Sequence, residues 1–513
     1  MSRNKTLNRR QLLWGGAVLG GAVALGGGAT ALAGPMLDRD RPNLTHGVLS
    51  GDVNGDRGVI WTRADRSGKM WVELSTREDF KHSWKVRGSN FMAANDFTGK
   101  ARVDGLPAGK TIHYRVWAED EHRSHPLTGS FRTTPAAGHD VRFVWSGDIA
   151  GQGWGRNPDI GGYTIFADMA KSDPDFFLCS GDFYYGDNPL RETVKLPDGR
   201  VWKNVTSDAK SKVAETLKEF RGQYQYNLKD ENLSAFLSTT PMINQWDDHE
   251  VLNNWYPGEI HDDPNYTIKS VDVLAARARK AFAEYTPNPL KPDGEGRIYR
   301  KISHGPLLDV FMLDMRTYKD PNTLNDSPDG GRVLGKIQLD WLKQELARSK
   351  ATWKVIANDT PLANIIGDGP KNIEGIGQRD NGKPLGREIE LAGLLSYIKK
   401  SKIKGLVWIT TDVHYTAAHH YDPSRAAFTD FDPFWEFITG PINAGAFGPN
   451  KVDTTFGTKV EFAKAPDADH QNTTPLDGYQ FYGEVAIDAA SKDLTVRLME
   501  IGGKELWTKT LGA

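Results

Sequence analysis

Residues 175–187, DFFLCSGDFYYGD, decide the fold prediction for this chain of 513 residues. The first six form a short apolar run, which predicts a buried β-strand. The run stops at Gly181, and Asp182 and Tyr185 follow almost directly. Polar side chains at the end of a buried strand are typical of α/β sheets, where ligands bind beyond the carboxyl ends of the strands.

Four further apolar runs end in acidic residues. VRFVWS (141–146), PMINQW (241–246), WKVIA (353–357) and LVWITT (406–411) are followed, in that order, by Asp148, by Asp247 and Asp248, by Asp359 and by Asp412. A single acid after a strand is usually a turn former or a helix cap. Five such strand ends predict carboxylates that converge on one place. Because converging carboxylates repel one another unless a cation lies among them, the sequence predicts a metal site.

The types of donor atom narrow the choice of metal. Carboxylate oxygens suit Ca²⁺, Mg²⁺ and Mn²⁺, and a phenolate such as that of Tyr185 suits Fe³⁺. Cys179 is the only cysteine, so a closed thiolate zinc site is excluded, and we expect this thiol to be packed in the core. His414 offers a nitrogen ligand. Asp182 is the expected bridging carboxylate because it lies in the Gly-Asp-x-x-Tyr segment.

The chain around these motifs divides into an all-β region and an α/β region. Short alternating segments separated by turn residues predict a small sandwich of the immunoglobulin or fibronectin III kind at residues 40–136. Residues 139–513 alternate apolar β runs with amphipathic helices and include a helical insertion at about 207–240, which predicts helices packed on a β core. The Gly- and Pro-rich stretches 187–206 and 365–388 are predicted to be functional loops.

The first 33 residues have the pattern of an export signal. Arg9 and Arg10 precede a weakly apolar run from Leu12 to Ala33 that ends in a small-x-small motif. This predicts a cleaved twin-arginine signal peptide at residues 1–33, the twin-arginine export machinery as a partner, and a periplasmic or secreted protein. A membrane anchor is the alternative, but the run is rich in Gly and makes a poor spanning helix, so we expect no stable span in the mature protein.

The charge balance excludes one class of partner. The 64 Lys and Arg residues nearly match the 66 Asp and Glu residues, and the formal net charge is −2. A dedicated nucleic-acid-binding protein usually has a strong basic excess. We therefore expect no nucleic-acid-binding domain, whereas a small charged substrate is compatible with this composition.

The order of the motifs resembles the calcineurin-like metallophosphoesterases, and in detail the PhoD-like alkaline phosphatases and phosphodiesterases. The matching segments are GDFYY (181–185), WDDHE (246–250), LDMRTY (313–318), TTDVH (410–414) and, near the N-terminus, GVLSGDVNGDRGVIWTR (47–63). The resemblance implies a four-layer β-sandwich flanked by helices. It also implies an exported phosphoesterase in which two or more metal ions activate a hydroxide that attacks phosphate mono- or diesters.

The resemblance implies a role for each residue of the site. Seven residues fall at metal-ligand positions: Asp148, Asp182, Tyr185, Asp248, Asp359, Asp412 and His414. His249 matches a histidine that contacts the phosphoryl group or donates a proton to the leaving oxygen. Arg316 is a candidate phosphate clamp, and a buried ion pair with Asp314 or another acid is the alternative. Some members carry a Cys iron ligand in a Ser-Cys-Gln segment where this chain has Ser146-Gly147-Asp148.

Neighbouring residues have less specific predictions. We expect Glu250 to support the ligands rather than to be one, whereas Asp187 could be a ligand or a supporting residue. Asp247 is expected to hold a neighbouring loop. Trp154 and Trp255 are candidate pocket walls, and His419 and His420 are expected in a loop near the site.

Three alternatives to the phosphatase prediction stay open. A phospholipase D-like phosphodiesterase would use the same chemistry on lipid headgroups. A metal-dependent hydrolase could act on another bond. A non-catalytic Ca²⁺-binding surface protein would need the carboxylates, but it would have no use for His249 beside them.

Overall fold

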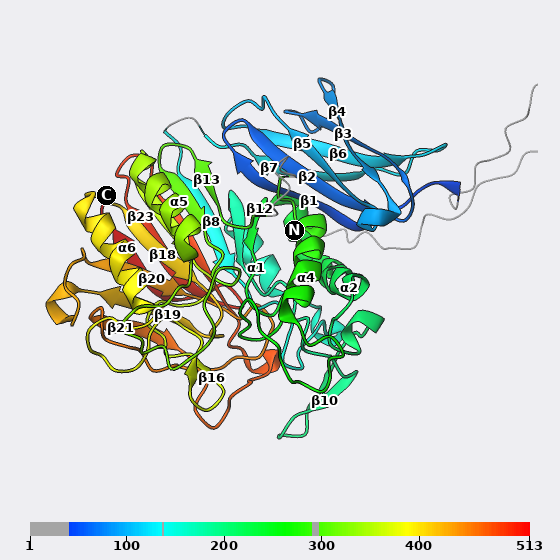
Figure 1. Ribbon diagram of the computed structural model, residues 1–513. Helices are drawn as coiled ribbons and strands as arrows, with labels where there is room; N and C mark the ends of the chain where they lie inside the picture. Colours follow the sequence, from blue (N-terminus) through cyan, green and yellow to red (C-terminus); the bar gives the residue numbers. More distant parts are fainter. Residues whose placement is uncertain (1–39, 136–137, 290–296) are drawn as a thin grey trace, which may run out of the picture. The chain divides into compact units, whose positions relative to one another are not determined.

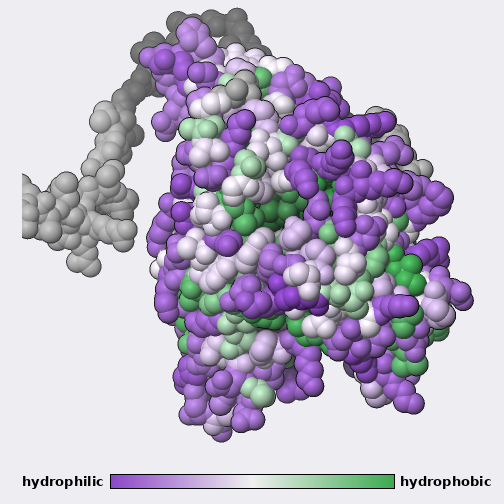
Figure 2. Space-filling model, turned by 90° about the vertical axis from the view of Figure 1, so that its left-hand side faces the viewer, coloured by the Kyte–Doolittle hydropathy of each residue, from purple (hydrophilic) through white to green (hydrophobic). Residues whose placement is uncertain are grey.

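The structure is a computed structural model that describes residues 40–135, 138–289 and 297–513. Residues 41–513 form one compact unit. The predicted signal peptide lies outside the described residues. Among the residues that the structure does describe, we find no helix with the length and hydropathy needed to cross a membrane. Most of the face drawn in Figure 2 is hydrophilic, and hydrophobic residues occur on it in separate patches.

A nine-stranded sheet carries three of the predicted strand ends (Figure 1). Its strand order is β24-β23-β22-β8-β9-β12-β1-β2-β5. The strands are β1 (Leu44–Asn54), β2 (Arg57–Ala64), β5 (Thr98–Val103), β8 (Val141–Ser146), β9 (Phe176–Ser180), β12 (Met242–Gln245), β22 (Phe481–Ile487), β23 (Leu494–Glu500) and β24 (Lys504–Leu511). Strands β8, β9 and β12 are parallel neighbours, so their carboxyl ends lie along the same edge of the sheet.

A seven-stranded sheet carries the other two strand ends. Its order is β13-β14-β15-β18-β20-β19-β21. The strands are β13 (Arg300–His304), β14 (Leu308–Met312), β15 (Trp353–Ala357), β18 (Leu406–Thr410), β19 (Thr416–Tyr421), β20 (Phe434–Ile438) and β21 (Thr458–Lys464). Strands β14, β15, β18 and β20 run parallel and again bring their carboxyl ends to one edge.

Helices cover the outer faces of both sheets. Helices α1 (Ile165–Lys171), α2 (Leu217–Leu228), α3 (Glu231–Thr239) and α4 (Val271–Tyr285) share one apolar core with the nine-stranded sheet. Helices α5 (Gly335–Arg348) and α6 (Glu388–Lys400) share another core with the seven-stranded sheet. A third core lies between the two sheets. The predicted α/β class, with helices on a β core, is confirmed.

Burial of both faces explains the unbroken apolar stretch at residues 176–179. Along β9, Phe176 and Leu178 face the core between the sheets, whereas Phe177 and Cys179 face the helices. Successive side chains of a strand point to opposite faces, so a strand covered on both sides needs apolar residues at every position. Cys179 is a buried core thiol, as predicted.

The N-terminal region is all-β, as predicted, but three of its strands belong to the nine-stranded sheet of the α/β region. Strands β3 (Gly68–Ser75), β4 (Trp84–Phe91), β6 (Thr111–Glu119) and β7 (Leu127–Arg132) form a four-stranded sheet. This sheet packs on β1, β2 and β5 around a common apolar core. Strand β1 also pairs in parallel with β12, at Gly51 and Met242, so β1, β2 and β5 extend the nine-stranded sheet.

Both predicted functional loops contain short hairpins. Residues 187–206 include β10 (Thr193–Lys195) paired with β11 (Val201–Lys203), and residues 365–388 include β16 (Gly367–Asp368) paired with β17 (Asn372–Ile373). The helical insertion predicted at about 207–240 is confirmed as α2 and α3.

Candidate active site

The strand ends of both sheets bring acidic and histidine side chains together. Ligand atoms of Asp148, Asp182 and His414 lie within 4.8 Å of one another, and the same holds for Asp182, Asp248 and His249. A third group joins Asp247, Asp248 and Asp412. These residues follow β8, β9, β12 and β18, so the convergence expected from the sequence is present.

The backbone is strained where the strands enter the site. Four non-glycine residues there have positive φ angles: Asp148 (58°), Asp182 (48°), Asp412 (74°) and His414 (61°). A left-handed conformation costs a non-glycine residue about 1–3 kcal/mol and persists where the surrounding structure imposes it, often at functional sites. Gly440, which follows β20, packs tightly against Asp148. A residue with a Cβ atom at this position would collide with Oδ2 of Asp148.

His414 is held as a neutral imidazole. Its Nδ1 lies 2.5 Å from the carbonyl oxygen of Gly445, which can only accept, so Nδ1 carries the proton and Nε2 keeps its lone pair. That Nε2 lies 2.8 Å from the hydroxyl of Tyr185 and 3.7 Å from Oδ1 of Asp148. Burial lowers the pKa of His414 to about 4, so the ring stays neutral in the physiological range.

Two of the buried carboxylates have oxygens without a hydrogen-bond partner in the described part of the chain. Both oxygens of Asp148, and Oδ1 of Asp248, are buried with no hydrogen-bond partner among the described residues. Burial, together with the neighbouring carboxylates of Asp248 and Glu250, raises the pKa of Asp148 well above its usual range. Burial and the carboxylates around it raise the pKa of Asp182 in the same way. Unpartnered buried oxygens among repelling acids fit cation binding, since a metal would satisfy both.

His249 is oriented by an acid that the sequence left undecided. Its Nδ1 lies 2.8 Å and 2.9 Å from the two carboxylate oxygens of Asp187, and its Nε2 lies 3.9 Å from Oδ1 of Asp248. The backbone N–H of His249 donates to Oδ1 of Asp182 at 3.1 Å. Asp187 therefore fixes the imidazole, whose Nε2 side faces the acids of the site.

Glu250 supports the ligand loops, as expected. Its carboxylate accepts hydrogen bonds from the backbone N–H groups of Asp182 (3.0 Å), Phe183 (2.8 Å) and Asp247 (2.9 Å). One buried carboxylate thus joins the turn after β9 to the turn after β12. Hydrogen bonds to a charged acceptor are among the stronger ones in proteins, so this residue holds the two turns in register.

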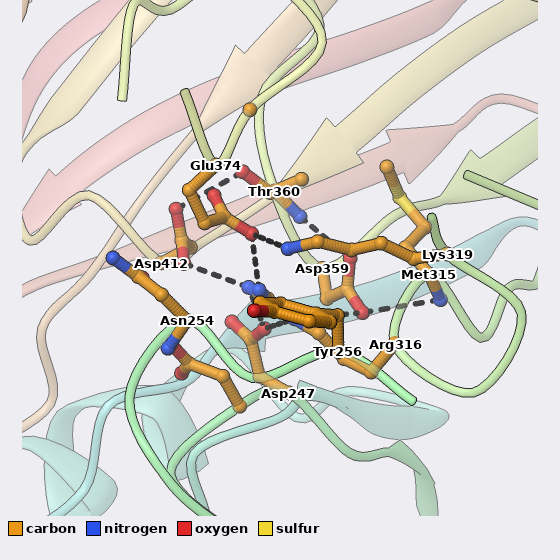
Figure 3. Close-up of polar contacts among 12 residues, drawn as sticks. Asp247, Asn254, Tyr256, Met315, Arg316, Lys319, Asp359, Thr360, Glu374 and Asp412 are labelled. Atoms are coloured by element: carbon orange, nitrogen blue, oxygen red, sulfur yellow. Dashed lines mark hydrogen bonds and ion pairs between the residues drawn. The ribbon is translucent and has the colours of Figure 1, made fainter. Parts of the chain in front are cut away.

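Arg316 lies at the centre of a buried ion-pair network (Figure 3). Its Nε donates to Oδ1 of Asp247 at 2.7 Å, its Nη1 pairs with Oε1 of Glu374, and its Nη2 lies 3.2 Å from Oδ1 of Asp412. Lys319 reaches the same oxygen of Glu374 at 2.6 Å. The Arg316 side chain is only 1% exposed, so carboxylates rather than a substrate surround the guanidinium.

The sequence leaves two roles open for Arg316, a phosphate clamp and a buried ion pair. The alternative prediction, a buried ion pair, describes the geometry better, with Asp247 and Glu374 as the principal partners. Asp314 accepts only a backbone hydrogen bond from Arg316, at 3.3 Å. Arg316 therefore orients acids of the site instead of facing its opening.

Asp359, which the resemblance places at a metal-ligand position, is held by backbone hydrogen bonds. It is fully buried, and its oxygens accept backbone hydrogen bonds from Thr360 (2.9 Å) and Met315 (3.3 Å). Its nearest charged neighbour is Arg316, whose Nε lies 3.8 Å away. Asp359 belongs to none of the metal-capable groups found among the described residues. The turn after β15 directs this carboxylate toward the ion-pair network.

A cavity of about 860 Å³ opens over the site. Asp248, His249, Asp412 and His414 line it, and so do Ile366 and Gly367 of the predicted loop 365–388. Six amide side chains share the lining: Gln152, Asn188, Asn253, Asn254, Asn450 and Gln471. Within the described chain no Lys or Arg lines this cavity, so among its side chains only the histidines can offer positive charge to an anionic substrate.

Several residues predicted near the site lie elsewhere. Trp154 packs with Trp202 in a separate apolar cluster, and Trp255 packs against Trp246, so neither lines the cavity. His419 and His420 lie in strand β19, not in a loop. Conversely, sequence reasoning missed Glu374 and Lys319. The only available signal for Glu374 was its position in the predicted loop 365–388.

Comparisons with known proteins agree with this geometry. The profile of the PhoD-like phosphatase family matches residues 143–498, and that of the PhoD-like phosphatase N-terminal domain matches residues 29–135. Alkaline phosphatase D of Bacillus subtilis (strain 168) is 28% identical over 483 residues, which cover 88% of this chain and 78% of that protein.

Solved structures show the same fold. The structure of PhoD has a TM-score of 0.70 at 23% sequence identity, over 91% of this chain and 90% of the other. A purple acid phosphatase from yellow lupin (Lupinus luteus) seeds has a TM-score of 0.53 at 10% identity, over 92% of this chain and 74% of the other.

Proposed function

Because the chain belongs to the PhoD-like phosphatase family and is a phosphoric ester hydrolase, we propose that it hydrolyses phosphate monoesters, diesters or both at a binuclear metal centre. One observation carries this proposal: two metal-capable groups of donors share Asp182. One group adds Asp148 and His414, and the other adds Asp248 and His249. Asp248 also shares a group with Asp412, so that pair can hold a metal while His249 serves as a proton donor. A carboxylate common to two neighbouring groups suits a bridging ligand.

The donors suggest how two metals would be held. Asp148, His414 and the nearby phenol of Tyr185 would hold one ion, Asp248 and Asp412 would hold the other, and Asp182 would lie between them. Carboxylate oxygens suit Ca²⁺, Mg²⁺ or Mn²⁺, and the phenolate suits Fe³⁺. When bound, such a metal pair lowers the pKa of a water molecule to yield hydroxide and stabilises the attacking and leaving oxygens of an in-line displacement.

His249 is the proposed proton donor. Burial alone would lower its pKa, but the carboxylates of Asp187 and Asp248 raise the pKa to about 9. With Nδ1–H donating to Asp187, the second proton of the imidazolium is on Nε2, and His249 lines the cavity. This proton is suitably located to reach the leaving oxygen of an ester.

Arg316 is proposed as a positioning residue. Its guanidinium holds one oxygen of Asp412 at 3.2 Å, while the hydroxyl of Thr360 donates to the other at 3.1 Å. The carboxylate of Asp412 is thereby fixed from both sides. The substrate phosphate would then be recognised by the metals and His249, with the amide side chains of the cavity around its organic part.

Export and domain division are part of the same proposal. The Arg9-Arg10 pattern supports a twin-arginine signal peptide at residues 1–33 and a periplasmic or secreted location. Two separate family profiles support a division into an N-terminal domain at residues 40–136 and a catalytic domain at 139–513. We propose that the first is immunoglobulin-like and that the second is a four-layer sandwich.

Membership of a phosphatase family argues against a non-catalytic Ca²⁺-binding protein. One alternative activity with the same chemistry is left. A phospholipase D-like phosphodiesterase would use the same centre and differ in its leaving group. Substrate tests, rather than the ligand set, distinguish the two.

A paired assay tests the proposal. Purified mature protein of known metal content is given p-nitrophenyl phosphate, bis-p-nitrophenyl phosphate and phosphatidylcholine vesicles, with and without EDTA, beside the Asp182→Asn variant. We expect ester turnover that EDTA and the substitution both abolish. The rate ratio then gives the preference for monoester, diester or lipid. A folded, metal-loaded protein that cleaves none of the three would contradict the proposal.

A further inference from the structure

A second cavity, of about 600 Å³, lies beside helix α2 and shares no lining residue with the cavity over the candidate active site. One side is formed by Lys218 and Gln225 of α2 and by Lys229, which directly follows the helix, at spacings that place them on one face. Residues 205–209 form another wall, and Arg63 of the N-terminal β region completes the lining. We call this space the α2 cavity. Pockets where two regions of a chain meet are common ligand sites.

Some of the charges around the α2 cavity neutralise one another. Arg63 lies 3.0 Å from a carboxylate oxygen of Asp96, and both line the cavity. Arg221 makes two hydrogen bonds, of 2.7 Å and 2.8 Å, to Glu284. These two arginines are therefore already paired and are not free to bind an added anion.

Three other cations of the lining have no direct ion-pair partner in the described chain, although the charge of Arg156 also acts on Asp230, an acid outside the lining. Arg156, Lys218 and Lys229 form no ion pair within the parts of the chain that the structure describes. Of the three acids in the lining, Asp96 is paired with Arg63, and Glu219 is paired with Lys212 at 2.9 Å. Asp208 has no ion-pair partner among the described residues. Three unpaired positive charges thus face one negative charge. This excess is local, since the whole chain has a formal net charge of −2.

Arg156 is rigidly held in the lining. Its guanidinium carbon lies 4.7 Å from the centre of the Tyr226 ring, which supports it from one face. Its backbone N–H donates to the Tyr226 hydroxyl, and its carbonyl accepts from the N–H of Val205, both at 2.8 Å. Its Nε is buried and has no hydrogen-bond partner in the described chain. A buried donor without an acceptor points to a missing ligand, which can also be a water molecule.

Hydroxyl groups add further donors. Thr206 and Ser207 line the same wall, and Ser207 precedes a short 3-10 helix (Asp208–Lys210) without making a side-chain cap bond. The cavity therefore combines a planar guanidinium, two ammonium groups and free hydroxyls. Arginine presents several N–H donors in a fixed plane that matches phosphate oxygens, and lysine adds charge.

We propose that the α2 cavity is an anion-binding site that takes a phosphate group, with Arg156, Lys218 and Lys229 as its cationic contacts. The phosphate can be free inorganic phosphate or part of an organic molecule, since the same donors recognise both. This site is independent of the proposed function, because none of its residues belongs to the candidate active site.

Calorimetric titration of the metal-loaded, mature protein with inorganic phosphate at low salt tests the proposal. We expect two binding sites in the wild type. The Lys218→Gln/Lys229→Gln variant should lose one of them or bind at least ten-fold more weakly there, and Arg156→Gln should behave likewise. Both lysines are exposed, so the double variant keeps the fold, which a melting curve checks. Lys280→Gln is the matched control, because this exposed lysine on α4 does not line the cavity.

A second titration with methylphosphonate identifies the source of the phosphate group. Equal binding of both probes means that the α2 cavity accepts an organic substituent, and binding of phosphate alone means that it selects the free anion. Hydrolysis of p-nitrophenyl phosphate should be unchanged in the double lysine variant. The proposal is overturned if the double variant binds phosphate with the same number of sites and the same affinities as Lys280→Gln, whether the wild type has one site or two. Phosphate binding at the α2 cavity would persist even if no ester were turned over.

Discussion

Asp187 binds His249 with both oxygens of its carboxylate, at 2.8 Å and 2.9 Å from Nδ1. The two side chains are only 6% and 9% exposed. Because the contact is buried, it fixes the plane of the imidazole and favours its charged form. Asp187 lies just after the Gly-Asp-x-x-Tyr segment, so one short stretch of chain supplies both a candidate metal bridge and the residue that orients the candidate acid.

Asp187→Asn should lower kcat by roughly 10–100-fold, the usual cost of losing a carboxylate that orients a histidine. It should also lower the pKa of His249, because the charge that raises it is removed. Activity that needs protonated His249 is lost as pH rises through this pKa, so the alkaline limb of the pH–rate profile should move to lower pH. A profile that falls in height but keeps its alkaline limb would mean that Asp187 has only a structural role.

His249→Gln should affect substrates according to their leaving groups. General acid catalysis contributes roughly 10²–10⁴-fold when the leaving oxygen needs a proton. An alkyl phosphate should therefore lose rate by that factor, whereas p-nitrophenyl phosphate, whose leaving group departs as a stable anion, should lose much less. Measuring kcat/KM for both substrates in the wild type and the variant checks this. An equal loss for both would contradict proton donation by His249.

Arg316→Met should destabilise the fold. It leaves the carboxylates of Asp247 and Glu374 buried without their main partner, and breaking a buried ion pair costs about 3–5 kcal/mol. Denaturant unfolding measures this free energy. Arg316→Met/Glu374→Gln should recover part of the loss, because it removes one of the orphaned charges. If Arg316 were instead a phosphate clamp, KM would rise and the unfolding free energy would stay the same.

Glu388 should make stability depend on pH away from the active site. Burial, and then repulsion by Asp453, raise the pKa of Glu388 from the usual 4.5 to about 8. Between these values the folded protein keeps the proton and the unfolded chain has lost it, so stability falls as pH rises across this window. Glu388→Gln removes this dependence. The melting temperature of the variant relative to the wild type should be higher at pH 8 than at pH 5, and an equal difference at both would refute the assignment.

Much of the architecture was predictable because it is encoded locally. The apolar runs at 141–146, 175–180 and 406–411 match β8, β9 and β18 to within a residue or two. Strand ends that carry acids predicted a convergent site, since parallel strands bring their carboxyl ends to one edge. Long-range pairing was not predictable: β1 joins β12 at Gly51 and Met242, which lie far apart in the sequence.

The roles of some site residues could not be predicted either, because they depend on contacts between residues that lie far apart in the sequence. Asp359 follows a strand as the other acids do, but nothing in its sequence neighbourhood says that its carboxylate turns toward Arg316. Glu374 comes from a distant loop and meets Arg316 only in three dimensions. The direction of a side chain at a strand end depends on tertiary packing. The sequence alone therefore predicted which residues lie near the site more reliably than it predicted the role of each residue.

The binuclear centre is the central claim, and the metal content of folded protein tests it most directly. Elemental analysis by mass spectrometry, beside a melting curve, is applied to the wild type and to Asp182→Asn. We predict two metal ions per wild-type chain, and a folded variant that retains at most one ion and has lost ester hydrolysis. A folded Asp182→Asn variant that still holds two ions and hydrolyses esters at the wild-type rate would contradict the claim.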